Sequence, residues 1–243
     1  MNNSIQTISF LNLAIAFIPA LAGVGILIKW SLNPGVASYA LLRMLLQLLI
    51  IGYLLTFIFG AESAWMIILV LAVMLFASSW IALRTIPARR AGMLRHAFMA
   101  ITVGGGITLL LVTQGVLDLE PWYWPQYLIP LAGMIFANAM TAVSLAAERY
   151  FAESSRGVEY QEARNIAMAA ALVPVINSLF AVGLVALPGM MTGQILSGIS
   201  PFIAVRYQVM VMCMIFGASA ISTALFLTLI KQAAAETVPA GAD

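Results

Sequence analysis

Long apolar runs separated by short polar segments make up most of the chain. A helix needs about 20 apolar residues to cross a bilayer. We expect such helices over residues 10–28, 41–59, 64–83, 97–116, 128–147, 171–198 and 207–230. The pattern predicts an all-α, polytopic membrane protein with about seven transmembrane helices. We expect one transmembrane domain over residues 1–230 and a disordered C-terminal tail over residues 231–243.

The sixth run, ALVPVINSLFAVGLVALPGMMTGQILSG, is interrupted by residues that disturb helices. Pro174 and Pro188 each remove an amide donor, and Gly189 can adopt backbone angles that other residues avoid. Inside a bilayer the freed carbonyl groups must find partners in other helices, water or a ligand. The run therefore predicts a sixth span that is broken or re-entrant at a Pro188-Gly189 hinge. The alternative is a plain helix that ends at Leu187 before a tight turn.

Small residues predict close helix packing in two other spans. The fourth contains three consecutive glycines at positions 104–106, which weaken a helix but let a neighbour approach closely. In the fifth, Gly133, Ala137 and Thr141 recur on one face beside Asn138. This spacing is typical of a helix packed in the interior of a bundle.

Composition agrees with the membrane assignment and excludes several functions. The chain is 63% hydrophobic and only 8% charged, and its mean hydropathy is +1.04, values that a soluble domain does not reach. A single cysteine, Cys213, and a single histidine, His96, argue against a disulfide and a cysteine or histidine metal cluster. Hydrolase, metalloprotease and phosphate-loop motifs are missing, so we expect neither an enzyme nor a cofactor nor a nucleic-acid partner.

The basic residues are distributed unevenly between the predicted loops, and cytoplasmic loops carry an excess of Lys and Arg. With the N-terminus outside, the cytoplasmic side holds Lys29, Arg84, Arg89, Arg90, Arg95, Arg149, Arg156, Arg164 and Lys231, and only Arg206 lies outside. The acidic and aromatic segment 118–127, DLEPWYWPQY, is then an outer interfacial belt. The distribution predicts an external N-terminus and a cytoplasmic C-terminus.

Four stretches spread over most of the chain carry a family resemblance. They are LLRMLLQLLIIGY (41–53), AITVGGGIT (100–108), IPLAGMIFANAMTAVS (129–144) and VGLVALPGMMTGQIL (182–196). These stretches resemble the Fet-type iron-export permeases of ABC transporters. The resemblance implies a permease in the bacterial inner membrane that exports iron or a related metal, forms a homodimer and pairs with a separate ABC ATPase subunit.

Within this interpretation, residues in the spans are candidates for lining a polar substrate path: Asn138, Asn177, Ser178, Met190 and Met191. Methionine thioethers are soft metal ligands, although methionines in such helices more often fill the core or face lipid.

Charged residues between the spans are candidates for contacting the ATPase: Arg89, Arg90, Glu159, Glu162 and Arg164. The last three lie in the polar stretch 148–165, which is otherwise a solvated loop or a short surface helix. This stretch is shorter than in the family. Two further hypotheses therefore stay open, namely a secondary transporter that works without ATP and a membrane scaffold that transports nothing.

Overall fold

The computed structural model describes residues 8–60 and 63–236. Within these residues, seven helical segments are long and apolar enough to cross a membrane: Phe10–Lys29, Gly35–Ile58, Ala64–Thr85, Pro87–Val116, Pro125–Ser154, Tyr160–Ala181 and Pro201–Lys231. The described chain contains no strand, and its only β-type pairing is an isolated bridge between Val182 and Ala186. The predicted all-α, polytopic fold is confirmed.

The chain divides into two compact units, Met1–Glu62 and Ser63–Asp243. A single transmembrane domain over residues 1–230 stays a prediction. The first unit contains α1 (Phe10–Ile15), α2 (Phe17–Lys29) and α3 (Gly35–Ile58). The helix break at Ala16 follows from Pro19, which has no amide hydrogen to donate to the carbonyl of Ile15.

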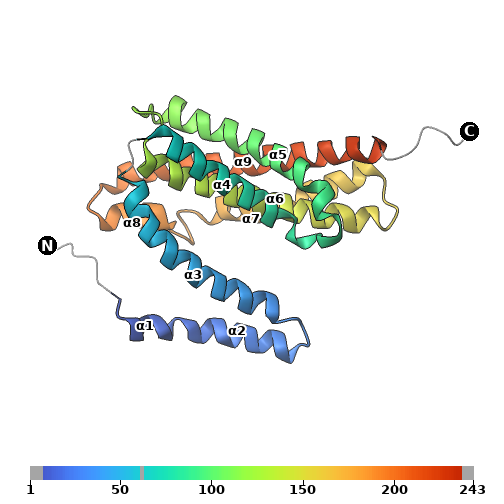
Figure 1. Cartoon of the computed structure of the whole chain (residues 1–243), viewed down its shortest axis with the longest axis horizontal. Helices are drawn as coiled ribbons and strands as arrows, with labels where there is room; N and C mark the ends of the chain where they lie inside the picture. Colours follow the sequence, from blue (N-terminus) through green and yellow to red (C-terminus); the bar gives the residue numbers. More distant parts are fainter. Residues whose placement is uncertain (1–7, 61–62, 237–243) are drawn as a thin grey trace, which may run out of the picture. The chain divides into compact units, whose positions relative to one another are not determined.

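The second unit is a bundle of long helices with short connections (Figure 1). Its elements are α4 (Ala64–Ala82), the turns η1 (Leu83–Thr85) and η2 (Pro87–Arg89), α5 (Arg90–Leu110), the π-helical turn η3 (Leu111–Val116), α6 (Pro125–Ser154), α7 (Tyr160–Ala181), α8 (Gly189–Leu196) and α9 (Pro201–Glu236). Helices α5, α6 and α9 pack against one another, and α4, α7 and α8 pack around them. Buried residues concentrate on α6, which has neighbours on several sides.

Two of the three consecutive glycines are points of close contact between α5 and its neighbours. A Cβ atom on Gly104 would overlap Ser222 Oγ and lie 2.7 Å from the Ser222 backbone nitrogen of α9. A Cβ on Gly105 would lie 3.1 Å from side-chain atoms of Ile135 and Phe136 of α6. Gly106 has no such neighbour within 4 Å. Close packing is thus confirmed at two positions, which face two different helices.

The predicted small-residue face of α6 is not its packed face. Ala137 and Thr141 are exposed, whereas Ala132, Ile135 and Ala139 on other faces are fully buried. The prediction of a packed helix is correct, but the residues that pack are different. Sequence spacing identified a stripe of small residues without showing which way the helix is rotated.

The polar stretch 148–165 consists mainly of helix ends. Helix α6 continues to Ser154 and α7 starts at Tyr160, so only a five-residue turn, 155–159, connects them. The prediction of a loop or separate surface helix is therefore wrong for most of the stretch. Helix α9 likewise runs to Glu236, past the expected start of the disordered tail at residue 231. Residues 237–243 lie outside the described part.

The sixth segment is broken before Gly189, as predicted, but Pro174 does not break it, because this residue lies inside the continuous helix α7. Helix α7 ends at Ala181, and α8 begins at Gly189 after Pro188, which is its N-cap with φ −63° and ψ 149°. The residue with left-handed backbone in the connection is Gly183, at φ +82°, rather than Gly189. A glycine suits this position because residues with a Cβ rarely adopt such angles.

Candidate functional site

A cavity of about 350 Å³ lies among α6, α7, α8 and α9, near the end of the bundle where α6 begins and α7 ends. Its lining residues are Met134, Asn138, Ser178, Ala181, Val182, Ala186, Pro188, Gly189, Met190, Gln208, Val211, Met212 and Ile215. The α9 residues among them have spacings of three and four, which places them on one face of that helix. The helix break between Ala181 and Gly189 supplies one wall.

Five of the residues predicted from the sequence meet at this cavity: Asn138, Ser178, Pro188, Gly189 and Met190. Asn177 and Met191 do not line it. Neighbours in a helix point about 100° apart, and here Ser178 rather than Asn177, and Met190 rather than Met191, faces the cavity. The structure thus brings together residues that lie as far apart in sequence as Asn138 and Met190.

The polar side chains of the cavity differ in whether their hydrogen bonds are satisfied. Asn138 Nδ2 donates to the carbonyl of Met134 at 2.8 Å, and Ser178 Oγ donates to the carbonyl of Pro174 at 3.0 Å. Both bonds stay within one helix, so the Asn138 side-chain oxygen remains available as an acceptor.

Gln208 is the residue that sequence reasoning missed. It is only 5% exposed, and its Oε1 atom has no hydrogen-bond partner among the described residues. A buried polar atom without a partner carries a substantial free-energy cost, so its presence in a cavity wall needs an explanation. The available signal was an uncharged polar residue inside the seventh apolar run, one helical turn from Met212.

A second, polar hollow of about 460 Å³ lies at the same end of the bundle. Asp118 and Glu120 line it together with the aromatic residues Trp124, Tyr127 and Tyr207. This hollow is built from the acidic and aromatic segment that the sequence placed outside the membrane. The segment's location on the outer side stays a prediction.

Two arginines of the basic segment 84–95 pack against aromatic rings. The Arg90 guanidinium lies 3.6 Å from the centre of the Trp80 ring and donates to the Trp80 carbonyl at 2.7 Å. The Arg89 guanidinium lies 4.6 Å from the centre of the Phe151 ring. Arg90 is therefore partly buried against Trp80, whereas Arg89 is exposed beside α6.

Ion pairs of a buried carboxylate stabilise the turn between α6 and α7. Glu153 is 5% exposed and forms ion pairs with Arg149 at 2.8 Å and Arg156 at 3.5 Å. By contrast, Glu159 and Glu162 are exposed and pair with no described side chain. Their carboxylates are free to contact another molecule.

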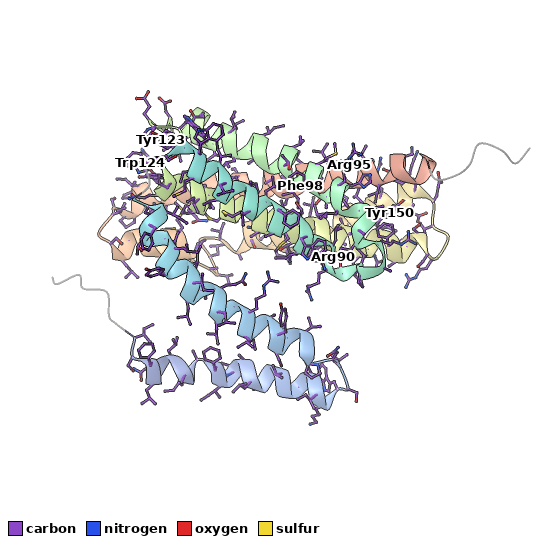
Figure 2. All side chains as sticks on the ribbon, viewed as in Figure 1. Arg90, Arg95, Phe98, Tyr123, Trp124 and Tyr150 are labelled. Carbon is purple, nitrogen blue, oxygen red and sulfur yellow. The ribbon has the colours of Figure 1, made fainter. Side chains whose placement is uncertain are left out.

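Arg164 is exposed, and its guanidinium donates to Asn165 Oδ1 at 3.2 and 3.0 Å. Close by, Tyr160 donates to the carbonyl of Leu227 at 2.9 Å, which connects α7 to α9. Figure 2 shows Arg90, Arg95 and Tyr150 toward one end of the second unit and Trp124 at the other. The cavity lies toward the end marked by Trp124, where α6 begins. The exposed charges of Arg89, Glu159, Glu162 and Arg164 lie toward the opposite end, where α6 ends and α7 begins.

Comparison with known proteins identifies the family. Residues 9–234 match the Uncharacterised protein family (UPF0014). The chain belongs to the UPF0014 family. The match covers all the apolar helices described above.

Named relatives of this UPF0014 chain come from bacteria and plants. It is 37% identical over 204 residues to the "Probable iron export permease protein FetB" of Escherichia coli, covering 76% of this chain and 77% of that protein. It is 34% identical over 206 residues to the Synechocystis "UPF0014 membrane protein slr1647", covering 78% and 80%. It is 36% identical over 207 residues to the "UPF0014 membrane protein STAR2" of Oryza sativa, covering 79% and 71%. No solved structure matches the chain.

The resemblance to Fet-type permeases is confirmed by these matches. Among its described residues, the UPF0014 chain has no group of three or more His, Cys, Asp or Glu side chains able to hold a metal ion. The polar and sulfur-containing side chains that line the cavity are the amides of Asn138 and Gln208, the hydroxyl of Ser178 and the thioethers of Met134, Met190 and Met212.

Proposed function

We propose that the chain is the permease subunit of an ABC transporter in the bacterial inner membrane, exporting iron or a related metal. The observation that supports this proposal most directly is the 37% identity to a protein named as an iron export permease, extending over most of both chains. The seven apolar helices provide the membrane-spanning part that such a subunit needs. ATP hydrolysis takes place on a separate subunit.

The cavity among α6 to α9 is the substrate-binding part of the proposed path. It combines a mainly apolar lining with a few polar groups, the composition typical of ligand pockets. Its wall includes the connection from Ala181 to Gly189, where the chain has no continuous helix to keep it rigid. Non-helical backbone at membrane depth is tolerated where it lines a cavity. In the proposed cycle, ATP binding to the partner changes which side of the membrane this cavity opens to.

The ATPase docks on the charged end of the bundle. Arg89, Glu159, Glu162 and Arg164 are exposed there and offer both signs of charge. A surface of mixed charge favours one orientation of the partner and gives a contact that weakens with salt. Arg90 is only partly exposed beside this surface, and its guanidinium is positioned by Trp80. Two permease chains assemble side by side with their ATPases.

Purification of the full-length protein in mild detergent tests the proposal. We expect a nucleotide-binding subunit to purify with it, and Glu159→Lys with Glu162→Lys to reduce the recovery of that subunit without reducing the membrane abundance of the permease. A matched control, Asp118→Lys with Glu120→Lys, reverses two exposed charges at the opposite end of the bundle and should leave the recovery unchanged. Absence of any nucleotide-binding subunit from the wild-type complex would contradict an ABC transporter.

A further inference from the structure

Three methionines from three different helices line the cavity: Met134 from α6, Met190 from α8 and Met212 from α9. The sequence contains 14 methionines, and nothing in their spacing distinguishes these three. The remaining polar lining consists of two amides and one hydroxyl, and no lining residue carries a charge. The cavity therefore has a neutral set of donors that is rich in sulfur.

Gln208 provides an independent sign of a ligand. Its side chain is buried to 95% by neighbouring groups, since only 5% is exposed, and its Oε1 atom lacks a partner although it belongs to a cavity-lining residue. A ligand in the cavity that is bound by this oxygen would remove the free-energy cost of leaving a buried acceptor without a partner. A bound cation meets that requirement.

The donor set selects the kind of cation. Thioether sulfur is a soft ligand that favours Cu(I), whereas carboxylate, carbonyl and water oxygens suit hard ions. Charge points the same way, because the cost of moving an ion out of water grows with the square of its charge. A divalent ion therefore costs about four times as much as a monovalent ion of the same size in a cavity with no negative group.

We propose that this cavity is a binding site for a soft monovalent metal cation of the Cu(I) class, with the thioethers of Met134, Met190 and Met212 as its principal ligands. Gln208 Oε1 turns toward the bound ion as an additional oxygen donor. Methionine side chains have three rotatable bonds, which lets the three sulfur atoms converge on an ion much smaller than the cavity of about 350 Å³. The inference rests on the proposed function in treating the cavity as the place where cargo binds, and it names a soft monovalent metal rather than iron as that cargo.

Binding of Ag⁺, which has the charge and softness of Cu(I) without its redox chemistry, tests the site in the full-length chain reconstituted in lipid nanodiscs. The exposed thiol of Cys213 also binds Ag⁺, so all measurements use a Cys213→Ser background. The test variant carries Met134→Leu, Met190→Leu and Met212→Leu, which nearly conserve side-chain volume. The control variant carries Met99→Leu, Met168→Leu and Met210→Leu, three methionines that do not line the cavity.

We expect the test variant to bind Ag⁺ at least about 100-fold more weakly than its parent, exceeding the effect of losing an outer-shell partner, and the control variant to bind like its parent. Fe²⁺ should compete poorly for the same site. Equal Ag⁺ affinity in the test variant and its parent, or stronger binding of Fe²⁺ than of Ag⁺, would overturn the proposal.

X-ray absorption on the Cu(I)-loaded Cys213→Ser protein gives a second measurement that does not depend on how the methionine variants fold. Sulfur atoms in the first shell of the metal are the expected result, and a first shell without sulfur refutes the site. These experiments need no ATPase. Failure to find an ATPase would therefore contradict the proposed function while leaving the metal site standing, and failure of Ag⁺ binding would do the reverse.

Discussion

Replacing Gly104 with alanine places a methyl group against the backbone of α9. Its Cβ would lie 2.7 Å from the Ser222 nitrogen and 3.0 Å from the Ser222 Cα, where ordinary contacts are 3.4–4 Å. Because both atoms belong to the main chain, no side-chain rotation relieves the overlap. Helices α5 and α9 must separate by roughly 1 Å, a gap that removes a quarter to a half of the dispersion attraction of each affected atom pair.

The size of the effect follows from two opposing terms. Overpacking of this kind costs about 1–3 kcal/mol, and we place Gly104→Ala at the upper end because backbone rather than side chain must move. Alanine is a better helix former than glycine by about 1 kcal/mol, which offsets part of the cost. The expected net destabilisation is about 1–2 kcal/mol.

Thermal unfolding of the detergent-solubilised protein measures the effect against two matched variants in the same helix. Gly106→Ala has no heavy atom within 4 Å of the new methyl group, so it should be neutral or slightly stabilising. Gly105→Ala meets side-chain atoms at 3.1 Å, which can shift, and should fall between the two. With about 2–4 °C per kcal/mol for a protein of this size, Gly104→Ala should melt several degrees below Gly106→Ala. Equal melting temperatures for all three variants would refute the assignment of Gly104 to the seam with α9.

Three further outcomes are expected. In a background without other cysteines, Trp122→Cys should react with an impermeant thiol reagent added to intact cells and Ala91→Cys only after permeabilisation; labelling of the latter in intact cells would invert the proposed orientation. Arg90→Ala should lower stability by about 1–3 kcal/mol, because it removes both the hydrogen bond and the ring contact with Trp80, and Arg90→Lys should recover only part of this loss. Gly183→Ala should lower the free energy of unfolding by about 1–2 kcal/mol, since φ is +82° there. Gly189→Ala should be tolerated, because no atom lies within 4 Å of the added methyl group.

The existence of most helices was predictable because it depends on local properties of the chain, although the sixth membrane-length helix is Tyr160–Ala181 rather than the predicted 171–198. A span of apolar residues long enough to cross a bilayer must satisfy its backbone hydrogen bonds within itself, which leaves the helix as the main option. The helix break that Pro19 causes at Ala16 and the break before Gly189 follow from the same local rules. Boundaries were less predictable, because helices such as α6 continue beyond the membrane into polar sequence until Ser154.

The sequence by itself thus determined the class of fold, the family and the candidates Asn138, Ser178 and Met190. Tertiary structure decided which way each helix faces, because a helix that is apolar all around carries no amphipathic pattern to show its buried side. Only packing places Gly104 against α9 while Gly106 touches nothing. For the same reason, only the convergence of four helix segments shows that Gln208 belongs to the cavity.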